Sequence, residues 1–359
     1  MKEINLGLGS PRDPAPEKAL FRFFEECKKP GGLGYAPTNG MREAREAVCW
    51  WQNARHGVRG LDPDANVTFA EGSRLLLVSA FEALFQHGDS VVLPSRFYNG
   101  HMDAAKKYGL CPVLVPMPKA SAYVDGIEEL VLGGMRPKAV VTCFVSNPTG
   151  LSCTASEYQR LVALAHQYQF LILDDYAYGA LDYRQGYVPS SLSVPGALDV
   201  VLWFGTASKM FSAASWKVGF CVGSKERVAL ITRTKSLYSE GGSRPGQLAT
   251  ATALRYCDAD VGRTRATYQH RAEFTTALLR QAGMSDAVMP DGGMFGWYPV
   301  PQGYPGGSVR LASELAPGIV VRDDRLYGGS GTHIRWCLRV SDAETRTACE
   351  HVAEVLKKG

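Results

Sequence analysis

The sequence predicts an α/β protein with a mostly parallel sheet, because apolar runs alternate with helical segments along the middle of the chain. The apolar runs do not alternate strictly with polar residues, as expected for strands that helices cover on both faces. The predicted strands are residues 90–94, 111–115, 139–145, 170–175, 200–204 and 218–222. The predicted helices between them are residues 101–108, 156–167 and 225–239.

Outside this alternating middle, the sequence predicts mainly helices and only one strand. Helical patterns outside it cover residues 17–29, 41–56, 75–85, 263–281 and 342–358, and a short strand is predicted within residues 332–340. We therefore predict a large domain over residues 30–262 and a smaller α+β domain that residues 1–29 and 263–359 form together.

The composition favours an enzyme over a small binding module. The chain has 359 residues, of which 45% are hydrophobic and 21% charged, so it can bury a sizeable core. Its net charge of +4 is mild and no long Lys/Arg run occurs, which argues against nucleic acid as a partner. No apolar run reaches about 18 residues, and the N-terminus has no apolar signal core. We expect no membrane segment and a cytoplasmic location.

The nine cysteines are odd in number and scattered. None forms a Cys-x-x-Cys pair with metal-ligand spacing, so we expect reduced thiols and no metal site.

Lys209 follows the predicted strand 200–204 and should lie just past its carboxyl end. Open α/β sheets place their chemistry at that edge. A Ser-Lys pair alone is more often a surface lysine in a polar turn. Asn147 and Asp175 also stand where predicted strands end, Tyr98 follows another strand, and Gly72-Ser73 begins a helix whose free N–H groups suit an anion. An ordinary N-cap serine is the simpler interpretation of Ser73 alone.

Together these groups suit a phosphorylated cofactor bound as an imine, and pyridoxal 5′-phosphate needs all of them. In this order, from Asn5-Leu-Gly-Leu-Gly-Ser-Pro to the terminal helix, the motifs resemble the class I and II aminotransferases of fold type I. The resemblance implies that Lys209 forms the Schiff base and shuttles the α-proton. It also implies that Asp175 pairs with the pyridine nitrogen. Asp174 is the competing residue, and Tyr178 has the family's spacing from Asp175.

The same resemblance assigns the other positions. Asn147 and Tyr178 would bind the ring's phenolic oxygen, and Tyr98 would stack on the ring. The phosphate would be held by Gly72, Ser73, Arg74, Thr206, Ser208 and Tyr35, the last from a second subunit of a homodimer with shared active sites. The substrate's α-carboxylate would be bound by Arg335, with Arg339 as the competing choice, and Gly9 and Asn147 would also contact the substrate.

Two residues depart from the family pattern. Lys217 stands where an arginine usually makes a two-pronged contact with the phosphate, and lysine supplies the charge without the fork. Arg322 falls where a proline-glycine pair is usual. With Arg12 and Arg74 it could add positive charge near the substrate, although we expect at least two of these three arginines to be solvated at the surface.

The resemblance implies that the protein moves the amino group of an L-amino acid to a 2-oxo acid. The alternative is a lyase, cyclase or oxidase of the same fold that acts at the β or γ carbon, because the same carbanion leads to each of these reactions. A third hypothesis is a ligand-sensing domain of a transcription regulator. The lack of room for a DNA-binding helix pair before Asn5 argues against this hypothesis.

Overall fold

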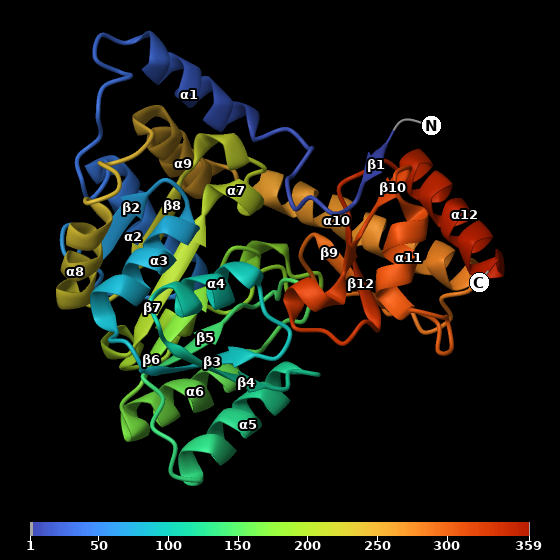
Figure 1. Cartoon of the computed structure of the whole chain (residues 1–359). Helices are drawn as coiled ribbons and strands as arrows, with labels where there is room; N and C mark the ends of the chain where they lie inside the picture. The colour runs from blue at the N-terminus through green and yellow to red at the C-terminus, as the bar shows by residue number, and fades with distance from the viewer. Residues whose placement is uncertain (1–2, 359) are drawn as a thin grey trace.

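The computed structural model describes residues 3–358, and its centre is a seven-stranded sheet (Figure 1). The strand order is β2-β8-β7-β6-β5-β3-β4. The strands are β2 (Val67–Ala70), β3 (Ser90–Pro94), β4 (Cys111–Val115), β5 (Ala139–Thr142), β6 (Leu171–Asp175), β7 (Val201–Thr206) and β8 (Gly219–Val222). Among these seven strands, β8 alone runs in the direction opposite to the other six. The prediction of a mostly parallel sheet is confirmed.

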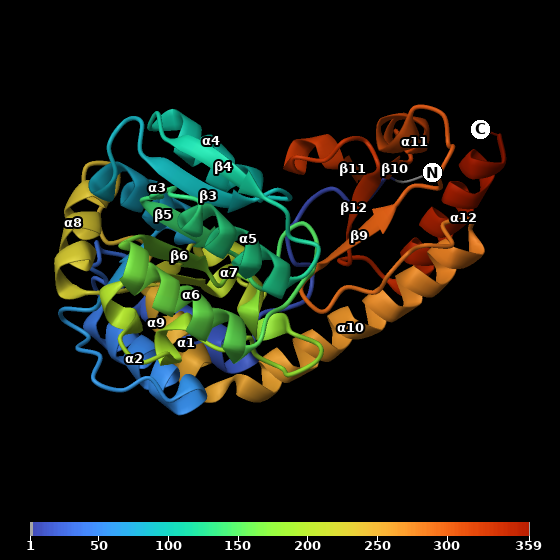
Figure 2. The same ribbon diagram turned by 90° about the horizontal axis from the view of Figure 1, so that it is seen from below.

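Helices cover both faces of this sheet (Figure 2). One face carries α3 (Ser73–Leu84), α4 (Asn99–Lys107) and α8 (Lys225–Lys235); the other carries α2 (Arg42–His56), α5 (Ala120–Leu132), α6 (Ala155–Tyr168) and α9 (Arg244–Tyr256). Within β3, Val91 and Leu93 pack on the first group of helices and Val92 packs on the second. Both faces of each central strand are therefore apolar, which explains why the runs did not alternate in the sequence.

A second body of structure lies beside the sheet and is formed by both ends of the chain (Figure 1). Its three-stranded antiparallel sheet has the order β11-β12-β9, and β1 from the N-terminal end pairs in parallel with β10. The elements are β1 (Ile4–Asn5), β9 (Phe295–Pro299), β10 (Ile319–Val320), β11 (Arg322–Asp323), β12 (His333–Cys337), α11 (Gly307–Leu315) and α12 (Asp342–Lys358). The long helix α10 (Asp258–Gln281) runs from the large body into this one.

The N-terminal helix α1 (Glu17–Lys28) packs against α9 of the large body. Its buried Glu26 accepts a hydrogen bond of 2.9 Å from Arg244 of α9. The domain boundaries at residues 29/30 and 262/263 stay a prediction. The remaining short elements are α7 (Ala207–Met210) and the 3₁₀ turns Gly179–Leu181, Ser191–Ser193, Ala197–Asp199, Ala214–Trp216 and Asp324–Tyr327.

Several elements differ from the sequence prediction. The strand predicted to continue to residue 145 ends at Thr142, after which the chain turns through Ser146–Gly150. Strand β2 and helices α5, α9 and α11 were not predicted. Strand β2 has only four residues, and α9 contains Pro245 and Gly246 in its first turn, where they look like a loop in the sequence. No helix within residues 3–358 is long and apolar enough to span a membrane.

Candidate active site

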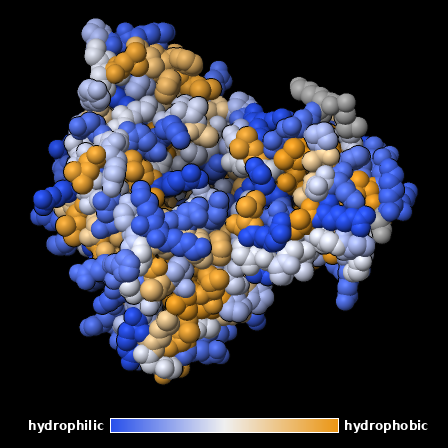
Figure 3. Space-filling model, viewed as in Figure 1, coloured by the Kyte–Doolittle hydropathy of each residue, from blue (hydrophilic) through white to orange (hydrophobic). Residues whose placement is uncertain are grey.

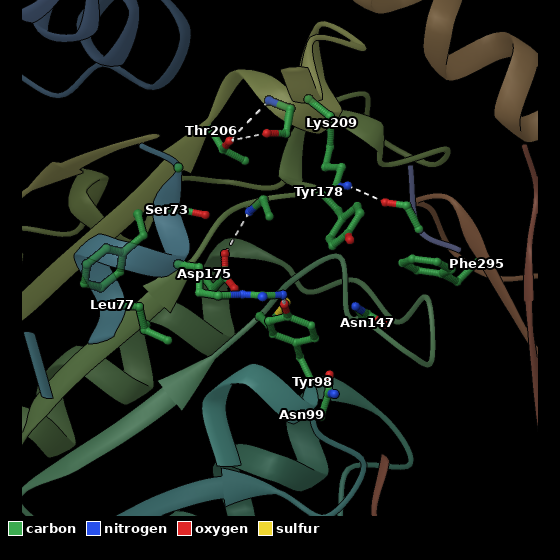
Figure 4. A pocket seen from close by; sticks show the side chains of 18 of the residues that line it. Ser73, Leu77, Tyr98, Asn99, Asn147, Asp175, Tyr178, Thr206, Lys209 and Phe295 are labelled. Carbon is green, nitrogen blue, oxygen red and sulfur yellow. Dashed lines mark hydrogen bonds between the residues drawn. The ribbon is translucent and has the colours of Figure 1, made fainter. Parts of the chain in front are cut away.

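A cavity of about 980 Å³ lies where the carboxyl ends of the parallel strands meet the N-terminal loop and the smaller sheet. Almost every residue predicted for the site lines it. These residues are Gly9, Gly72, Ser73, Arg74, Tyr98, Asn147, Asp175, Tyr178, Thr206, Ser208, Lys209, Lys217, Arg322 and Arg335. Figure 4 shows Lys209, Asp175, Asn147 and Tyr98 around this cavity. The volume is at the upper end of ordinary ligand pockets, which allows a cofactor and a small substrate together.

Lys209 enters the cavity from α7, which begins directly after β7. The turn is fixed by Thr206, whose hydroxyl accepts a hydrogen bond of 3.2 Å from the Ser208 amide. The Lys209 ammonium donates to the carbonyl of Gly9 in the N-terminal loop. Burial lowers the pKa of Lys209 to about 8, and the positive charge of Arg335 contributes to the lowering. A substantial fraction of such an amine is neutral near physiological pH, and only a neutral amine is a nucleophile or a base.

The two neighbouring carboxylates of β6 face opposite sides of the sheet, because successive strand residues alternate. Asp174 is fully buried on the α6 side, where Thr142, Tyr158 and Ser191 donate hydrogen bonds of 2.8, 2.8 and 2.6 Å to it. Burial raises the pKa of Asp174 to about 6. Asp175 is on the α4 side and lines the cavity. Only Asp175 is therefore placed to contact a ligand.

His101 was missed in the sequence and is the partner of Asp175. Its Nε2 lies 2.9 Å from Oδ2 of Asp175, and its side chain is almost completely buried. Tyr98, three residues earlier at the start of α4, packs edge-on against the imidazole with ring centroids 5.2 Å apart. His101 and Tyr98 together fix the orientation of the Asp175 carboxylate. The only signal in the sequence was the one-turn spacing of Tyr98 and His101.

The start of α3 supplies an anion site on another wall of the cavity. Gly72 is the N-cap residue with φ +93°, and no side chain caps the first turn. Ser73 is thus the first helical residue, and the N-cap interpretation of this serine is wrong. Gly219 of β8 lies so close to Ser73 that a Cβ there would be 2.1 Å from the Ser73 nitrogen. The uncapped N–H groups of the helix start are available to an anion.

Lys217 lines the same cavity as this helix start and lies two residues before Gly219, which contacts Ser73. Its backbone is left-handed, with φ +54°, and the side chain is exposed. Within the described range 3–358, the Lys217 side chain makes no hydrogen bond or ion pair with another residue, while its backbone N–H donates to the Ala214 carbonyl. Thr206 and Ser208 complete this wall, and their hydroxyls are 3.0 Å apart.

Arg335 of β12 lines the same cavity and is held by two hydrogen bonds and two aromatic rings, while its buried Nε has no hydrogen-bond partner within residues 3–358. Its Nη1 donates to Asn147 Oδ1 at 3.0 Å, and its Nη2 donates to the Gly7 carbonyl at 2.8 Å. The guanidinium carbon lies 4.2 Å from the ring centroid of Phe295 and 4.6 Å from that of Tyr327. Two flat faces and two acceptors fix its plane, which suits a planar bidentate contact with a carboxylate.

The competing residue Arg339 lies beyond the end of β12 and outside the cavity lining, where its Nη1 is 3.5 Å from the Leu8 carbonyl. The other three arginines also differ from one another. Arg12 is at the surface and pairs with Glu344 at 3.0 Å. Arg74 and Arg322 both line the cavity, and Arg74 donates to the Tyr98 hydroxyl. All three arginines are exposed, although Arg74 and Arg322 also border the cavity, and the expectation that at least two of the three are solvated surface residues stays a prediction.

Tyr178 and Tyr35 occupy very different surroundings. Tyr178 is buried in the cavity wall with its ring 5.6 Å from that of Phe295, and burial raises the pKa of its phenol, which keeps the hydroxyl protonated as a donor. Tyr35 lies outside the cavity of its own chain and is 89% exposed.

Comparison with known proteins gives one consistent result. The chain matches the family Aminotransferase class I and II over residues 1–352. The glutamate-pyruvate aminotransferase AlaC of Escherichia coli is 30% identical over 348 residues, which cover 93% of this chain and 82% of that protein. LL-diaminopimelate aminotransferase 2 of Nostoc sp. is 28% identical and covers 98% of this chain and 90% of its own. The solved aspartate aminotransferase from Thermus thermophilus with maleate has a TM-score of 0.88 at 25% identity, covering 98% and 91% of the two chains.

The sheet, its helical layers and the cavity at its carboxyl edge define an α/β transferase of fold type I. The chain belongs to the class I and II aminotransferase family and is a pyridoxal-phosphate-dependent aminotransferase. Its residues fit that cofactor: an uncapped helix start faces the cavity for the phosphate, Asp175 for the pyridine nitrogen and a partly neutral Lys209 for the aldehyde. Enzymes of this family act on amino acids and 2-oxo acids.

Proposed function

We propose that Lys209 carries the cofactor and that the protein transfers the amino group of an L-amino acid to a 2-oxo acid at this cavity. The observation that carries the proposal is the position of Lys209 and Asp175, which stand at the ends of the adjacent strands β7 and β6 and face one cavity. When bound, the pyridoxal ring accepts the electron pair that remains after the substrate's α-proton is removed.

Lys209 is the proposed acid and base at the substrate's α-carbon. Burial holds its pKa at about 8, so the side chain both takes up and releases a proton near neutral pH. The α7 turn directs it into the cavity, and the Gly9 carbonyl orients its Nζ.

Asp175 is the proposed partner of the ring nitrogen. A carboxylate favours the protonated pyridine, which is the better electron acceptor. His101 holds the carboxylate by its Nε2, and the Tyr98 ring packs on His101 from the cavity side. Tyr98 is proposed to stack on the cofactor ring, while Asn147 and Tyr178 donate to its phenolic oxygen.

The phosphate is proposed to bind at the start of α3. The backbone N–H groups of Ser73 and Arg74 and the hydroxyls of Thr206 and Ser208 would hold it, with Lys217 as the nearby cation. At the other end of the cavity Arg335 would bind the substrate's α-carboxylate, assisted by Asn147 and the backbone of Gly9.

The experiment that tests the reaction is a panel of L-amino acids incubated with the holoenzyme, with and without 2-oxoglutarate. We expect keto acids that form in quantity only when the acceptor is present, with glutamate appearing in equal amount. Elimination or cyclisation products that form without the acceptor would contradict transamination. Mass spectrometry of the products distinguishes the two results.

We also propose a homodimer in which each active site receives Tyr35 from the partner. Support comes from exposed apolar side chains of α1 and the loop after it, namely Phe21, Phe24, Leu33 and Tyr35. Figure 3 shows hydrophobic surface over α1. Such a patch is unusual on a monomer and suits an interface between copies of the chain.

Sharing of sites is tested by mixing Tyr35→Phe subunits with Lys209→Ala subunits. A mixed dimer then has one intact site, formed by Lys209 of the first chain and Tyr35 of the second, so activity should recover to about half of wild type per mixed dimer. If dimers form but activity stays at the level of the single mutants, the sites are not shared.

A cytoplasmic location is proposed from the thiols. All nine cysteines are free, and Cys143, Cys153, Cys221, Cys257, Cys337 and Cys349 are buried. Reduced cysteines in this number favour a reducing compartment. Cell fractionation with an antibody against the native protein tests it, and recovery in a membrane or periplasmic fraction would contradict it.

A further inference from the structure

Lys235 is a fully buried lysine that lies outside the lining of the active-site cavity. It is the last residue of α8, and its ammonium donates one hydrogen bond to the Thr38 carbonyl and another, of 2.9 Å, to the Glu240 carbonyl. Burial lowers the pKa of Lys235, and the nearby carboxylates of Glu71 and Glu240 oppose the lowering. A buried ammonium costs free energy unless its N–H groups are bonded, so these contacts fix both carbonyls to the end of α8.

The two accepting carbonyls belong to the Tyr35 loop, residues 35–40, and to the α8–α9 segment, residues 236–243. These two segments are distant in the sequence, but their backbones touch. A Cβ on Gly241 of the α8–α9 segment would be 2.1 Å from the carbonyl oxygen of Pro37 in the Tyr35 loop. The lysine therefore joins two backbones at a place where only a glycine fits between them.

Gln247 of α9 holds the same loop by a second pair of hydrogen bonds. Its side chain is almost completely buried. Its Oε1 accepts a bond of 2.7 Å from the Met41 amide, directly after the Tyr35 loop, and its Nε2 donates to the Gly241 carbonyl. Side chains from α8 and α9 thus fix the far end of the Tyr35 loop.

Tyr35 itself stands at the exposed beginning of this loop. The four residues before it are Gly-Gly-Leu-Gly, so three of them have no side chain to pack, and Leu33 is 73% exposed. Tyr35 is 89% exposed, whereas Ala36 beside it is buried. The direction in which the Tyr35 side chain leaves the protein therefore depends on the anchored residues that follow it.

We infer that Lys235 is a positioning residue: together with Gln247 it fixes the Tyr35 loop so that Tyr35 reaches the cofactor phosphate of the partner subunit. This inference rests on the proposed function, because it uses the site that two subunits share. A change at Lys235 then weakens cofactor binding in the other subunit and leaves binding in its own subunit nearly unchanged.

The competing route for Lys235 runs within one chain. Ser239 of the α8–α9 segment donates to Glu71, which lines the cavity directly before the α3 start. Lys235 bonds directly to the backbone of the Tyr35 loop, whereas the route to the chain's own phosphate site passes through the Ser239 hydroxyl. The shorter connection favours an effect on the partner's site.

The test places the changes on chosen chains of a mixed dimer. Two differently tagged subunits are co-expressed and purified through both tags, and one of them carries Lys209→Ala, so that only the other site attaches the cofactor covalently. In the first arrangement Lys235→Met is on the Lys209→Ala chain, and in the second it is on the chain that keeps Lys209. Pyridoxal 5′-phosphate is titrated into the apoenzyme, and the yellow band of the cofactor attached to Lys209 reports the affinity of the intact site.

The two arrangements should differ. In the first, the intact site receives Tyr35 from the altered chain, and we expect its cofactor affinity to fall roughly 5- to 50-fold. In the second, Tyr35 comes from a chain with an unchanged Lys235, so the affinity should stay within about threefold of the dimer with Lys209→Ala alone. Lys225→Met, at the exposed start of α8, is the matched control and should change neither. Equal affinities in the two arrangements, or a larger loss in the second, overturn the inference.

Two further variants keep the result decisive. Gln247→Met loosens the same loop through different bonds, should give the same pattern, and decides the inference if Lys235→Met yields no folded dimer in gel filtration. Tyr35→Phe in the same two arrangements tests the shared site by itself. A loss for Tyr35→Phe in the first arrangement without one for Lys235→Met contradicts the inference alone. A loss for Tyr35→Phe in the second arrangement only contradicts the shared site and with it the inference.

Discussion

Replacement of Arg335 by lysine tests how the site orients its substrate. Arg335 is only 6% exposed, and its guanidinium is fixed between the rings of Phe295 and Tyr327 and by hydrogen bonds to Asn147 and Gly7. A lysine keeps the charge but offers no second parallel N–H donor and no flat face. Loss of one charge-assisted hydrogen bond costs about 1.5–3 kcal/mol, and loss of the stacking costs about 0.5–1 kcal/mol more. The sum of about 2–4 kcal/mol corresponds to a fall of roughly 30- to 1,000-fold in kcat/KM.

The assay is steady-state kinetics with the best amino acid from the panel, beside the absorbance spectrum of the holoenzyme. Arg335→Lys should leave the cofactor spectrum unchanged, because Arg335 is proposed to bind the substrate only. Arg339→Lys is the matched control, since Arg339 follows on the same segment outside the cavity lining, and it should change kcat/KM less than about threefold. If Arg339→Lys lowers kcat/KM and Arg335→Lys does not, Arg339 rather than Arg335 binds the α-carboxylate. If neither variant affects kcat/KM, the substrate has no α-carboxylate at this position.

Three further predictions concern the cofactor end of the site. Asp174→Ala leaves three buried hydroxyls without their acceptor and should lower the free energy of unfolding by about 3–5 kcal/mol in urea titrations. Asp175→Asn should leave the free energy of unfolding within about 1 kcal/mol of wild type and reduce kcat by at least ~10²-fold. The reverse pattern would exchange the roles of the two aspartates. Lys217→Arg adds two parallel N–H donors for the phosphate and should tighten cofactor binding to the apoenzyme roughly 5- to 30-fold. Lys217→Ala should weaken cofactor binding and keep the covalent attachment. Equal cofactor affinities of the three proteins in a fluorescence titration would exclude Lys217 from the phosphate site. Burial lowers the pKa of Lys209 to about 8, so its neutral fraction rises as the pH passes through 8. The rate at which acetic anhydride labels Lys209 in the apoenzyme should therefore level off above about pH 9. A labelling rate that keeps rising towards pH 11 would contradict the lowered pKa.

The sequence was sufficient to predict six of the seven strands of the large sheet and most of the cavity, because these depend on local patterns. Lys209, Asp175 and Asn147 each follow an apolar run, and parallel strands bring their carboxyl ends to one edge. The choice of Asp175 over Asp174 could be made from its spacing to Tyr178. Strand alternation gives the physical reason: one carboxylate points into the α6 layer and the other into the cavity.

The parts that were not predicted depend on contacts between distant segments. His101 is recognisable as the partner of Asp175 only after α4 is packed over the end of β6. The aromatic faces that hold Arg335 come from β9 and from the turn before β12. Arg322 was singled out in the sequence as a departure from the family pattern, but its place opposite Arg335 follows from the register of a strand of two residues. Such short strands leave no periodic pattern in a sequence.

The most direct test of the account is the position of covalent cofactor attachment. The holoenzyme is reduced with borohydride and digested, and the modified peptide is sequenced by mass spectrometry. The account predicts that the pyridoxyl group is on Lys209, the partly neutral amine that α7 directs into the cavity. It also predicts that Lys209→Ala abolishes the yellow absorbance band and that Lys217→Ala retains it. Modification of Lys217, or of any other lysine in place of Lys209, would contradict the central assignment.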